Sequence, residues 1–249
     1  MPGAQLARGA GSLTRTLNGH PDEQEAAPLG ERVVVIGHGN VAMDIVRLLA
    51  RDAVGLAGSD VDDEVHSRLT SQVSTIHVVG RSLPAAAKFD PVMVRELAGM
   101  PGVEHVLHGA QQLPEDGRDA RIDAVRELQR GVASGSSPAR VRVEWWFGLA
   151  PVSIEEDEAE QGRVTAATFV DSAGEVVRLE VDDVITAVGF TQNADAPVEA
   201  GVHVDGRVQP GLYVAGWLRR GPRGTIPDQR ADARSLAQLI ADDVRSGAV

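Results

Sequence analysis

A glycine pattern between an apolar stretch and an amphipathic stretch is the chemically most informative part of the sequence. Gly37, Gly39 and Ala42 have the spacing G-x-G-x-x-A and directly follow the apolar residues 33–36. In such a pattern the first glycine permits a tight turn, the second lets the backbone approach a pyrophosphate, and the third small residue allows close helix–strand packing. The N–H groups of the helix's first turn then face the anion. We therefore expect dinucleotide binding; the alternative is a glycine-rich loop that binds nothing.

The elements that position this loop are a strand before it and a helix after it. Residues 33–36 are mostly β-branched, which is typical of a strand buried on both faces of a parallel sheet. Beyond the glycines, apolar side chains recur near the helical period; they are Val41, Ile45, Leu48 and Leu49. The sequence thus predicts the start of a Rossmann-like βαβ unit.

Arg81 follows the next predicted strand, residues 74–81, at its carboxyl end. In a dinucleotide-binding unit the adenosine ribose arrives at this point. An acidic residue there accepts hydrogen bonds from NAD, whereas an arginine suits the 2′-phosphate of NADP. Arg81 therefore favours NADP, unless it is a solvated surface arginine.

Composition narrows the classes of function. The 249 residues include 24 basic and 36 acidic ones, and the net charge of −12 argues against nucleic acid as the main partner. Cysteine is absent, which excludes disulfides, iron–sulfur ligation and a redox-active cysteine pair, so any redox chemistry belongs to an organic cofactor. The acidic run 155–160 has no histidine nearby and indicates a solvated loop, so we predict no metal site. Without a long apolar run or a signal peptide, we expect a soluble, cytoplasmic protein and no membrane contact.

The remaining patterns predict a parallel sheet interrupted by an antiparallel meander. A short helix is expected at 91–99, and the third parallel strand at 102–109. The sequence divides into three predicted parts: a tail or linker at 1–30, an NADP-binding domain at 31–195 and a C-terminal part at 196–249. Within the NADP-binding domain, the meander strands are expected at 141–154, 163–170 and 175–181, and a strand at 182–190 returns to the parallel sheet.

The C-terminal part combines an apolar strand, an arginine-rich glycine loop and a closing helix. The helix is expected to carry an apolar face, formed by Leu236, Leu239, Ile240 and Val244. The strand is expected at 211–217, and the loop that follows reads LRRGPRGTIP. Such a loop between a strand and a helix suits an anion. Trp217 either covers a flat ring system or packs in the core. The arginines within 118–142 form either a surface that docks an acidic protein or a solvated helix face.

Together these motifs resemble the adrenodoxin reductase type of ferredoxin–NADP reductase, a flavoprotein with the two-domain glutathione-reductase fold. The resemblance extends from about residue 18 to the C-terminus. It is carried by NGHPD, VVVIGHGNVAMDIVRLL, SDVDDEV, VVGR followed by Pro84, Phe89 and REL at 95–97, then AVGF, and above all GLYVAGWLRRGPRGTI.

The resemblance implies roles for particular residues. The NADP pyrophosphate would be lined by His38, Gly39, Asn40 and Val41. Flavin would be contacted by Trp217, Gly224, Thr225 and Ile226, with Gly224 close to the nicotinamide. Asp44 matches a family carboxylate that is buried near the two rings and tunes proton or charge balance. By this comparison the C-terminal strand, loop and helix belong to a FAD-binding domain.

Three departures from the family pattern qualify these expectations. Ser82 stands where the family has a second arginine at the ribose end, and Met93 replaces a glutamate, which weakens the preference for NADP over NAD. The family's N-terminal FAD-binding unit has no counterpart here. We therefore expect the NADP half of a split, truncated or excised reductase, which binds FAD only weakly or with a missing partner segment. Its C-terminal strand and helix would fold back, pair across a homodimer or dock a separate FAD-binding chain.

The expected function follows from these assignments. NADPH would reduce FAD, and the flavin would pass electrons to a ferredoxin-like carrier. The alternative is a non-catalytic nucleotide-binding or interaction protein, a remnant that lacks its flavin half. A short-chain dehydrogenase is excluded, because it needs a Tyr-x-x-x-Lys pair, whereas Tyr213 and Lys88 are the only tyrosine and the only lysine.

Overall fold

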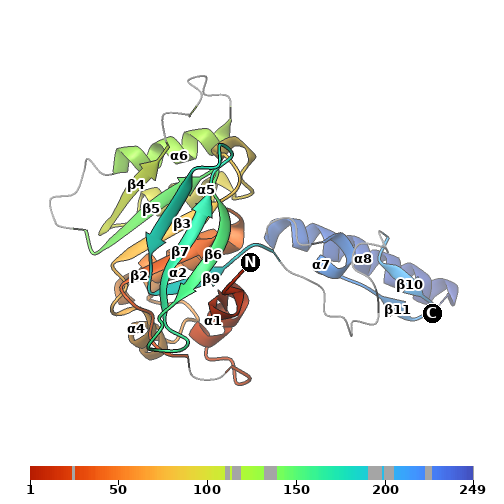
Figure 1. Cartoon of the computed structure of the whole chain (residues 1–249). Helices are drawn as coiled ribbons and strands as arrows, with labels where there is room; N and C mark the ends of the chain where they lie inside the picture. Colours follow the sequence, from red (N-terminus) through yellow and green to blue (C-terminus); the bar gives the residue numbers. More distant parts are fainter. Residues whose placement is uncertain are drawn as a thin grey trace. The chain divides into compact units, whose positions relative to one another are not determined.

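The computed structural model of the chain divides into two units, residues 1–188 and residues 189–249 (Figure 1). The structure describes residues 1–23, 26–109, 113, 119–131, 139–189, 198, 205–221 and 226–248. None of the helices in this described part is long and apolar enough to cross a membrane.

The first unit is built on a six-stranded sheet whose strand pairs are all parallel. In spatial order its strands are β1 (Arg8–Gly9), β9 (Asp183–Thr186), β2 (Arg32–Ile36), β3 (Thr75–Gly80), β5 (Val141–Phe147) and β4 (Val103–His108). From β2 the chain continues to β3 on one side, whereas β9 returns on the other. The carboxyl end of β2 is therefore the topological switch point, where open α/β sheets bind ligands.

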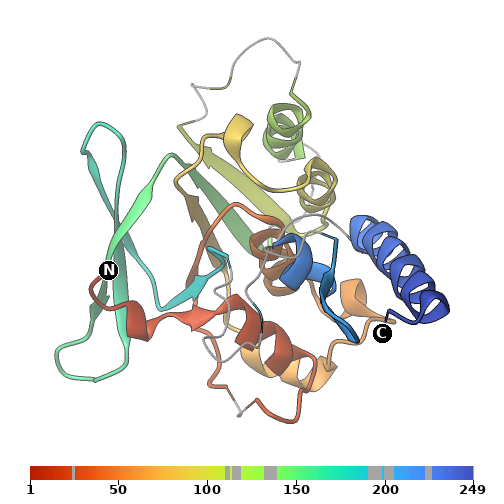
Figure 2. The ribbon, with the colours of Figure 1, turned by 90° about the vertical axis from the view of Figure 1, so that its right-hand side faces the viewer.

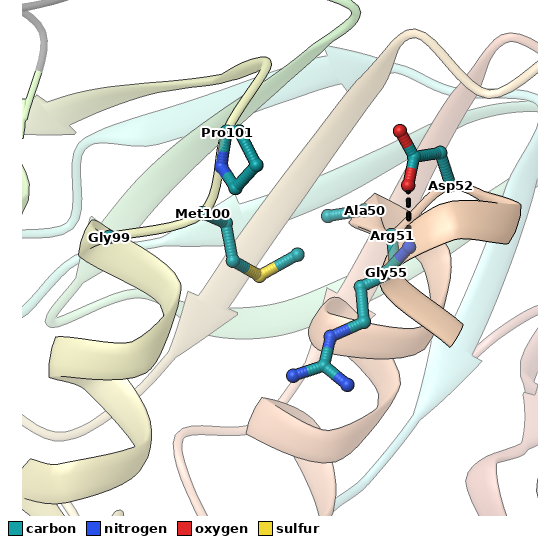
Figure 3. A pocket seen from close by; sticks show the side chains of 7 residues that line it. All are labelled: Ala50, Arg51, Asp52, Gly55, Gly99, Met100 and Pro101. Carbon is teal, nitrogen blue, oxygen red and sulfur yellow. Dashed lines mark hydrogen bonds between the residues drawn. The ribbon is translucent and has the colours of Figure 1, made fainter. Parts of the chain in front are cut away.

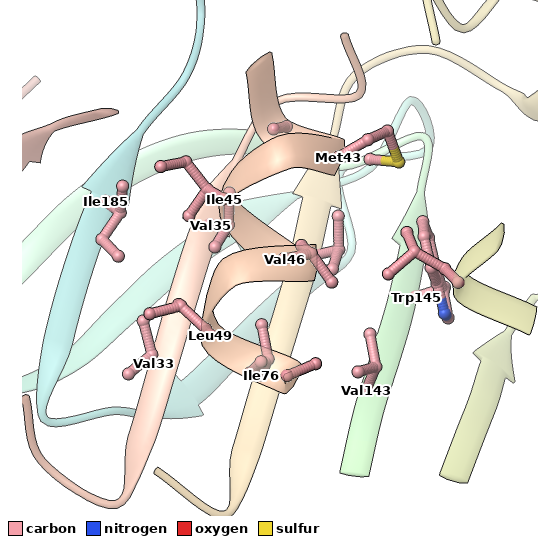
Figure 4. Packing of buried hydrophobic residues seen from close by; sticks show 14 of the residues in the cluster. Val33, Val35, Met43, Ile45, Val46, Leu49, Ile76, Val143, Trp145 and Ile185 are labelled. Atoms are coloured by element: carbon pink, nitrogen blue, oxygen red, sulfur yellow. The ribbon is translucent and has the colours of Figure 1, made fainter. Parts of the chain in front are cut away.

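Helices cover one face of this sheet, and a small antiparallel sheet covers the other (Figure 2). These helical elements are α1 (Ala10–Leu17), α2 (Asn40–Ala50), α3 (Ala53–Leu56), α4 (Asp63–Thr70), η2 (Pro84–Ala86), α5 (Pro91–Ala98) and α6 (Ala120–Gly131). By contrast, Leu6 of the short helix η1 (Ala4–Leu6) packs with the small sheet. Because alternate residues of a strand point to opposite faces, Val33 and Val35 pack with the helices, while Val34 and Ile36 pack with the small sheet. Figure 4 shows the side chains of α2 reaching the strands beneath it. The predicted Rossmann-like α/β fold with an inserted meander is confirmed.

The meander consists of β6 (Ala150–Glu156), β7 (Val164–Val170) and β8 (Val176–Glu180). The prediction of one meander strand over 141–154 was wrong. The chain turns at Gly148, whose φ is +78°, and only the part after this turn joins the meander. The part before it is β5, which pairs with β3 and β4 and buries Trp145 completely on the helix-covered face. Its buried residues Val141, Val143 and Trp145 alternate with more exposed ones, a period of two that a meander strand shares, so periodicity alone did not distinguish the two.

Residues 1–30 do not form the expected tail. Strand β1 pairs with β9, with Arg8 opposite Ile185. Helix α1 buries Leu13 and Leu17 in the helix-side core. These elements span only two and eight residues, so they show no sustained periodicity in the sequence, and tertiary pairing stabilises them.

The described residues of the second unit form a short antiparallel hairpin and two helices. Its elements are β10 (Arg207–Gln209), β11 (Leu212–Tyr213), α7 (Gly216–Arg220) and α8 (Ile226–Ser246). The predicted strand over 211–217 is therefore too long, because Gly216, at φ +59°, and Trp217 already belong to α7. Asp243 of α8 anchors the hairpin: its carboxylate accepts two hydrogen bonds from Arg207, at 2.9 and 2.5 Å, and one from the Tyr213 hydroxyl at 2.7 Å.

The expected apolar face of α8 is only partly buried. Leu236 is buried, Leu239 and Ile240 are half-buried, and Val244 is 58% exposed. The buried position next to Val244 belongs to Asp243, so a polar anchor replaces part of the predicted apolar contact.

Candidate functional site

Gly37 shapes the loop at the carboxyl end of β2. Its φ is +136°, and a Cβ atom there would lie 2.4 Å from the carbonyl oxygen of Ala187, the residue after β9. Its N–H donates to the carbonyl of Val79 at 2.7 Å, and the N–H of Ala187 donates to Ile36 at 2.8 Å. The loop is thus wedged between the ends of β3 and β9, where only glycine fits.

Gly39, unlike the enclosed Gly37, faces open space. It is the N-cap of α2, with φ −103°, and no side chain caps the helix. A Cβ atom on Gly39 would meet no other atom within 4 Å. The first turn of α2 carries no acidic side chain. The positive end of this helix, with its uncapped N–H groups, is therefore accessible to an anion, as the glycine spacing predicts.

The residues after Gly39 hold the helix in place. Ala42 is fully buried, so the helix lies close to the sheet. The side-chain oxygen of Asn40 accepts a hydrogen bond from the backbone N–H of Asp90 at 2.7 Å, which ties the start of α2 to the start of α5. Val41 is half-buried and packs against the helix-side core. At Asn40 and Val41 the groups available to an anion are therefore the backbone N–H groups rather than charged side chains.

The His38 side chain lies beneath the loop rather than at its surface. The residue is 6% exposed, and its ring lies 4.4 Å from that of Phe147. Its Nε2 is 3.3 Å from the carbonyl oxygen of Val78, and a Cβ atom on Gly80 would lie 2.7 Å from its Nδ1. Burial lowers the pKa of His38 to about 4, so the imidazole is neutral at physiological pH. Only the backbone of His38 remains for contact with a pyrophosphate.

Arg81 lies immediately after β3, as predicted. It is exposed, and its side chain has no hydrogen bond or ion pair with any residue the structure describes. Ser82 beside it is half-buried and adds no charge. Met93 is partly buried and packs against the helix-side core. Of these three residues, only Arg81 offers a cation to a phosphate group.

Asp44 lies on α2, one turn beyond the glycine loop. Its carboxylate is 3.7 Å from Arg47, which also donates to Glu96 at 2.8 Å. Partial burial raises the pKa of Asp44, against the opposing effect of Arg47. The family resemblance implies a buried carboxylate, whereas this side chain is 53% exposed. Its assignment as a catalytic residue stays a prediction.

The predicted flavin contacts belong to the second unit. Trp217 lies on α7 and is 41% exposed. Gly224 and Thr225 lie outside the described residues, as does the side chain of Ile226, the first residue of α8. These assignments also stay predictions.

A segment around Lys88, which no motif in the sequence indicated, lies beside the glycine loop. The N–H of Lys88 donates to the carbonyl of His38 at 3.0 Å, and Lys88 forms an isolated parallel β-bridge with Gly39. The signal available in the sequence was one charged residue, Lys88, between two apolar ones, Ala87 and Phe89; in the structure both apolar residues are buried and Lys88 is exposed. No pattern within a single chain segment gives the pairing with Gly39.

A small pocket lies away from the glycine loop, where α2 and α5 end (Figure 3). Its volume is about 200 Å³, and its walls are formed by Ala50, Arg51, Asp52, Gly55, Gly99, Met100 and Pro101. Asp52 is engaged in capping α3, since it accepts a hydrogen bond from Gly55 at 2.8 Å. The described residues include no cluster of side chains suited to a metal ion.

Comparison with known proteins supports the family resemblance. No protein-family model matches the chain. Cindoxin reductase of Citrobacter braakii is 41% identical over 97% of the chain and 54% of its own length. A probable ferredoxin/ferredoxin–NADP reductase of Mycobacterium tuberculosis is 32% identical over 99% of the chain and 46% of its own length. The structure of Mycobacterium tuberculosis FprA in complex with NADPH superposes with a TM-score of 0.81 at 26% identity, over 99% of this chain and 61% of that one.

The chain therefore spans about half the length of the curated relatives it matches. Within that span the match covers nearly every residue, including the glycine loop and the second unit. The resemblance to the adrenodoxin reductase type of ferredoxin–NADP reductase is confirmed over this length.

Proposed function

We propose that this homologue of the adrenodoxin reductase-type ferredoxin–NADP reductases is the pyridine-nucleotide-binding part of a flavin-dependent oxidoreductase. The observation that carries the proposal is the contrast between the two glycines. Gly37 is enclosed and fixes the turn, whereas Gly39 faces open space beside an uncapped helix N-terminus. A dinucleotide's pyrophosphate needs this arrangement, and a relative with the same fold forms a complex with NADPH.

The residues fit the coenzyme in the following way. The N–H groups of Gly39, Asn40 and Val41 hold the diphosphate, and the position of Arg81 suits the 2′-phosphate, with Ser82 beside it. His38 is neutral and packs beneath the loop. The positive potential of the site therefore comes from the backbone N–H groups of the helix N-terminus and from cationic side chains. When bound, NADPH supplies a hydride, which FAD accepts and passes on as single electrons to a ferredoxin-like carrier.

Asp44 and the second unit complete the proposal. The carboxylate of Asp44, whose pKa is raised and which lies beside Arg47, holds a proton or balances charge near the reacting rings. Trp217, Gly224, Thr225 and Ile226 contact the flavin. We propose that a separate FAD-binding chain or another copy in a homodimer contributes to the FAD site.

Titration of the purified chain with NADPH by calorimetry tests the proposal. We expect saturable, stoichiometric binding to the wild-type chain. In the variant Gly39→Ala the new methyl group occupies the space that the diphosphate needs, but meets no atom of the protein. We therefore expect binding at least about tenfold weaker, because one or two charge-assisted hydrogen bonds are lost. The melting temperature should fall by only about 2–4 °C, because alanine is a poorer N-cap than glycine. Equal binding by both proteins contradicts the proposed site.

A second assay separates the enzyme from a non-catalytic nucleotide-binding protein. The chain, NADPH and added FAD are mixed with a ferredoxin or a one-electron dye, and reduction is followed by absorbance. Reduction that depends on both the chain and FAD supports the oxidoreductase. NADPH binding without any reduction, even with excess FAD and the FAD-binding unit of a related reductase added, supports the alternative, a nucleotide-binding protein without turnover.

A further inference from the structure

The segment Ala87–Phe89 presents one cation next to the glycine loop. Ala87 and Phe89 are buried, with 1% and 3% of their surfaces exposed, whereas Lys88 between them is exposed. Side chains alternate between the two sides of an extended chain. The Lys88 side chain therefore projects on the side opposite to its two buried neighbours.

The β-bridge between Lys88 and Gly39 determines toward which part of the molecule the Lys88 side chain projects. Paired residues in adjacent extended segments project from the same face. On Gly39 that face is open, since a Cβ atom there would meet nothing within 4 Å. The bridge, together with the 3.0 Å hydrogen bond from the Lys88 N–H to His38, therefore places the lysine side chain beside the space above Gly39.

The charge of Lys88 is unbalanced at this position. Its ammonium group has no hydrogen bond or ion pair with the residues that the structure describes. Arg121, which contacts the carbonyl of Ala87, is by contrast neutralised by Asp119 at 3.0 Å. A cation close to a helix N-terminus is repelled by the helix dipole, and the first turn of α2 carries no acidic side chain to offset this. An anion bound above Gly39 removes that repulsion and pairs with the ammonium group.

We propose that Lys88 is a phosphate ligand of the coenzyme and sets its affinity. This inference rests on the proposed nucleotide-binding function and adds a residue to it. With Arg81 it gives the site two cations, although Ser82 stands where the related reductases are expected to carry a second arginine. Two groups of NADPH offer the same chemistry to Lys88: the diphosphate, which NADH shares, and the 2′-phosphate, which NADH lacks.

Calorimetric titration of NADPH and NADH into Lys88→Ala tests the inference. We expect the Kd for NADPH to rise at least about tenfold, as for the loss of one charge-assisted contact. Lys88→Arg, which keeps the charge, should retain most of the affinity. The matched control is Arg51→Ala, which removes from the far pocket a cation for which the described residues show no partner, and which should leave the Kd unchanged. Melting temperatures of all variants check that the fold is kept.

The two coenzymes distinguish the phosphate groups. A loss confined to NADPH assigns Lys88 to the 2′-phosphate, and an equal loss for NADH assigns it to the diphosphate. Wild-type affinity of Lys88→Ala for both coenzymes overturns the inference while leaving the nucleotide site intact. If the wild-type chain itself binds neither coenzyme, the proposed function fails and this inference with it.

Discussion

The two units of the chain are stabilised by different kinds of contact. In residues 1–188 two apolar clusters, one on each face of the sheet, enclose β2 and β3 almost completely. In residues 189–249 the only buried apolar side chains among the described residues are Val214 and Leu236. There a buried carboxylate, Asp243, connects the hairpin to α8, and Asp232 lies 3.4 Å from Arg219.

This difference determines which unit can hold a binding loop in one fixed conformation. Each fully buried Val, Leu or Ile side chain contributes about 1.5–3 kcal/mol. A partly exposed ion pair contributes about 1 kcal/mol or less, and for a buried pair the cost of desolvation offsets much of the attraction. The first unit can therefore hold a tight loop such as that at Gly37 in one conformation. The second unit has few such contacts of its own, so we expect its backbone amides to exchange with solvent before those of the sheet.

The largest expected effect is a loss of stability in residues 1–188, caused by a substitution in the glycine loop. In Gly37→Val the added side chain collides with the Ala187 carbonyl at a φ of +136° that valine avoids. Strain and overpacking together should lower the free energy of unfolding by about 3 kcal/mol or more. Denaturant unfolding measures this change. An unchanged midpoint would contradict the enclosed geometry of Gly37.

A pH effect of similar size is expected at His38. The folded chain holds this pKa at about 4, below the value of about 6.5 in the unfolded chain. Between these values the unfolded chain binds the extra proton, so stability falls by up to about 3 kcal/mol as the pH drops from 6.5 to 4 and is constant above 6.5.

The variant His38→Gln isolates this contribution. Its amide can still donate to Val78 but does not titrate in this range, so its stability should vary less with pH than that of the wild type. Unfolding measured at several pH values compares the two proteins. Parallel pH profiles would show that His38 is not buried as described.

A smaller effect, confined to the second unit, is expected from loss of the Asp243 charge. In Asp243→Asn the charge that pairs with Arg207 is lost, so amides in 207–213 should exchange faster at pH 7, whereas those of β2 are unaffected. Hydrogen exchange with mass spectrometry measures both regions. Faster exchange in both regions, or in neither, would remove the contrast between the units.

The wild-type hairpin should also respond to acid. Arg207 and the Tyr213 hydroxyl lower the pKa of Asp243, so its stabilising effect is full above the unfolded value near 4 and is lost as the pH falls through the lower folded value. Asp243→Asn should lack this dependence. A hairpin that responds to acid equally in both proteins would assign the effect to another group.

The smallest predicted change concerns coenzyme choice. Ser82→Arg adds a second cation beside Arg81 at the end of β3, so we expect the preference for NADPH over NADH to rise several-fold, by about 1 kcal/mol. Calorimetric titration of both coenzymes gives the ratio. A gain for NADH as large as that for NADPH would place residue 82 away from the 2′-phosphate.

Local patterns in the sequence were sufficient for the parts of the fold that they determine. The apolar strand, the glycine spacing and the helical period predicted β2, the loop and α2, and Arg81 lies just past β3 as expected. These features depend on neighbouring residues, so one chain segment contains the whole signal.

The features that were missed depend on contacts between distant segments. Pairing between β5 and β3, and between β1 and β9, decides which strands enter the sheet. The inward rotamer of His38 depends on the space that Gly80 leaves, and the position of Lys88 depends on its bridge to Gly39. No local period encodes such contacts, which is why the site's second cation emerged only from the structure.

The most direct test of the nucleotide site is the change in backbone amide NMR signals when NADPH is titrated into the isotope-labelled chain. We predict that the largest saturable shifts fall on residues 37–42 and 81–88, while Arg51 and Met100 at the distant pocket are unaffected. Shifts centred on that pocket, or no saturable shifts at all, would contradict the account.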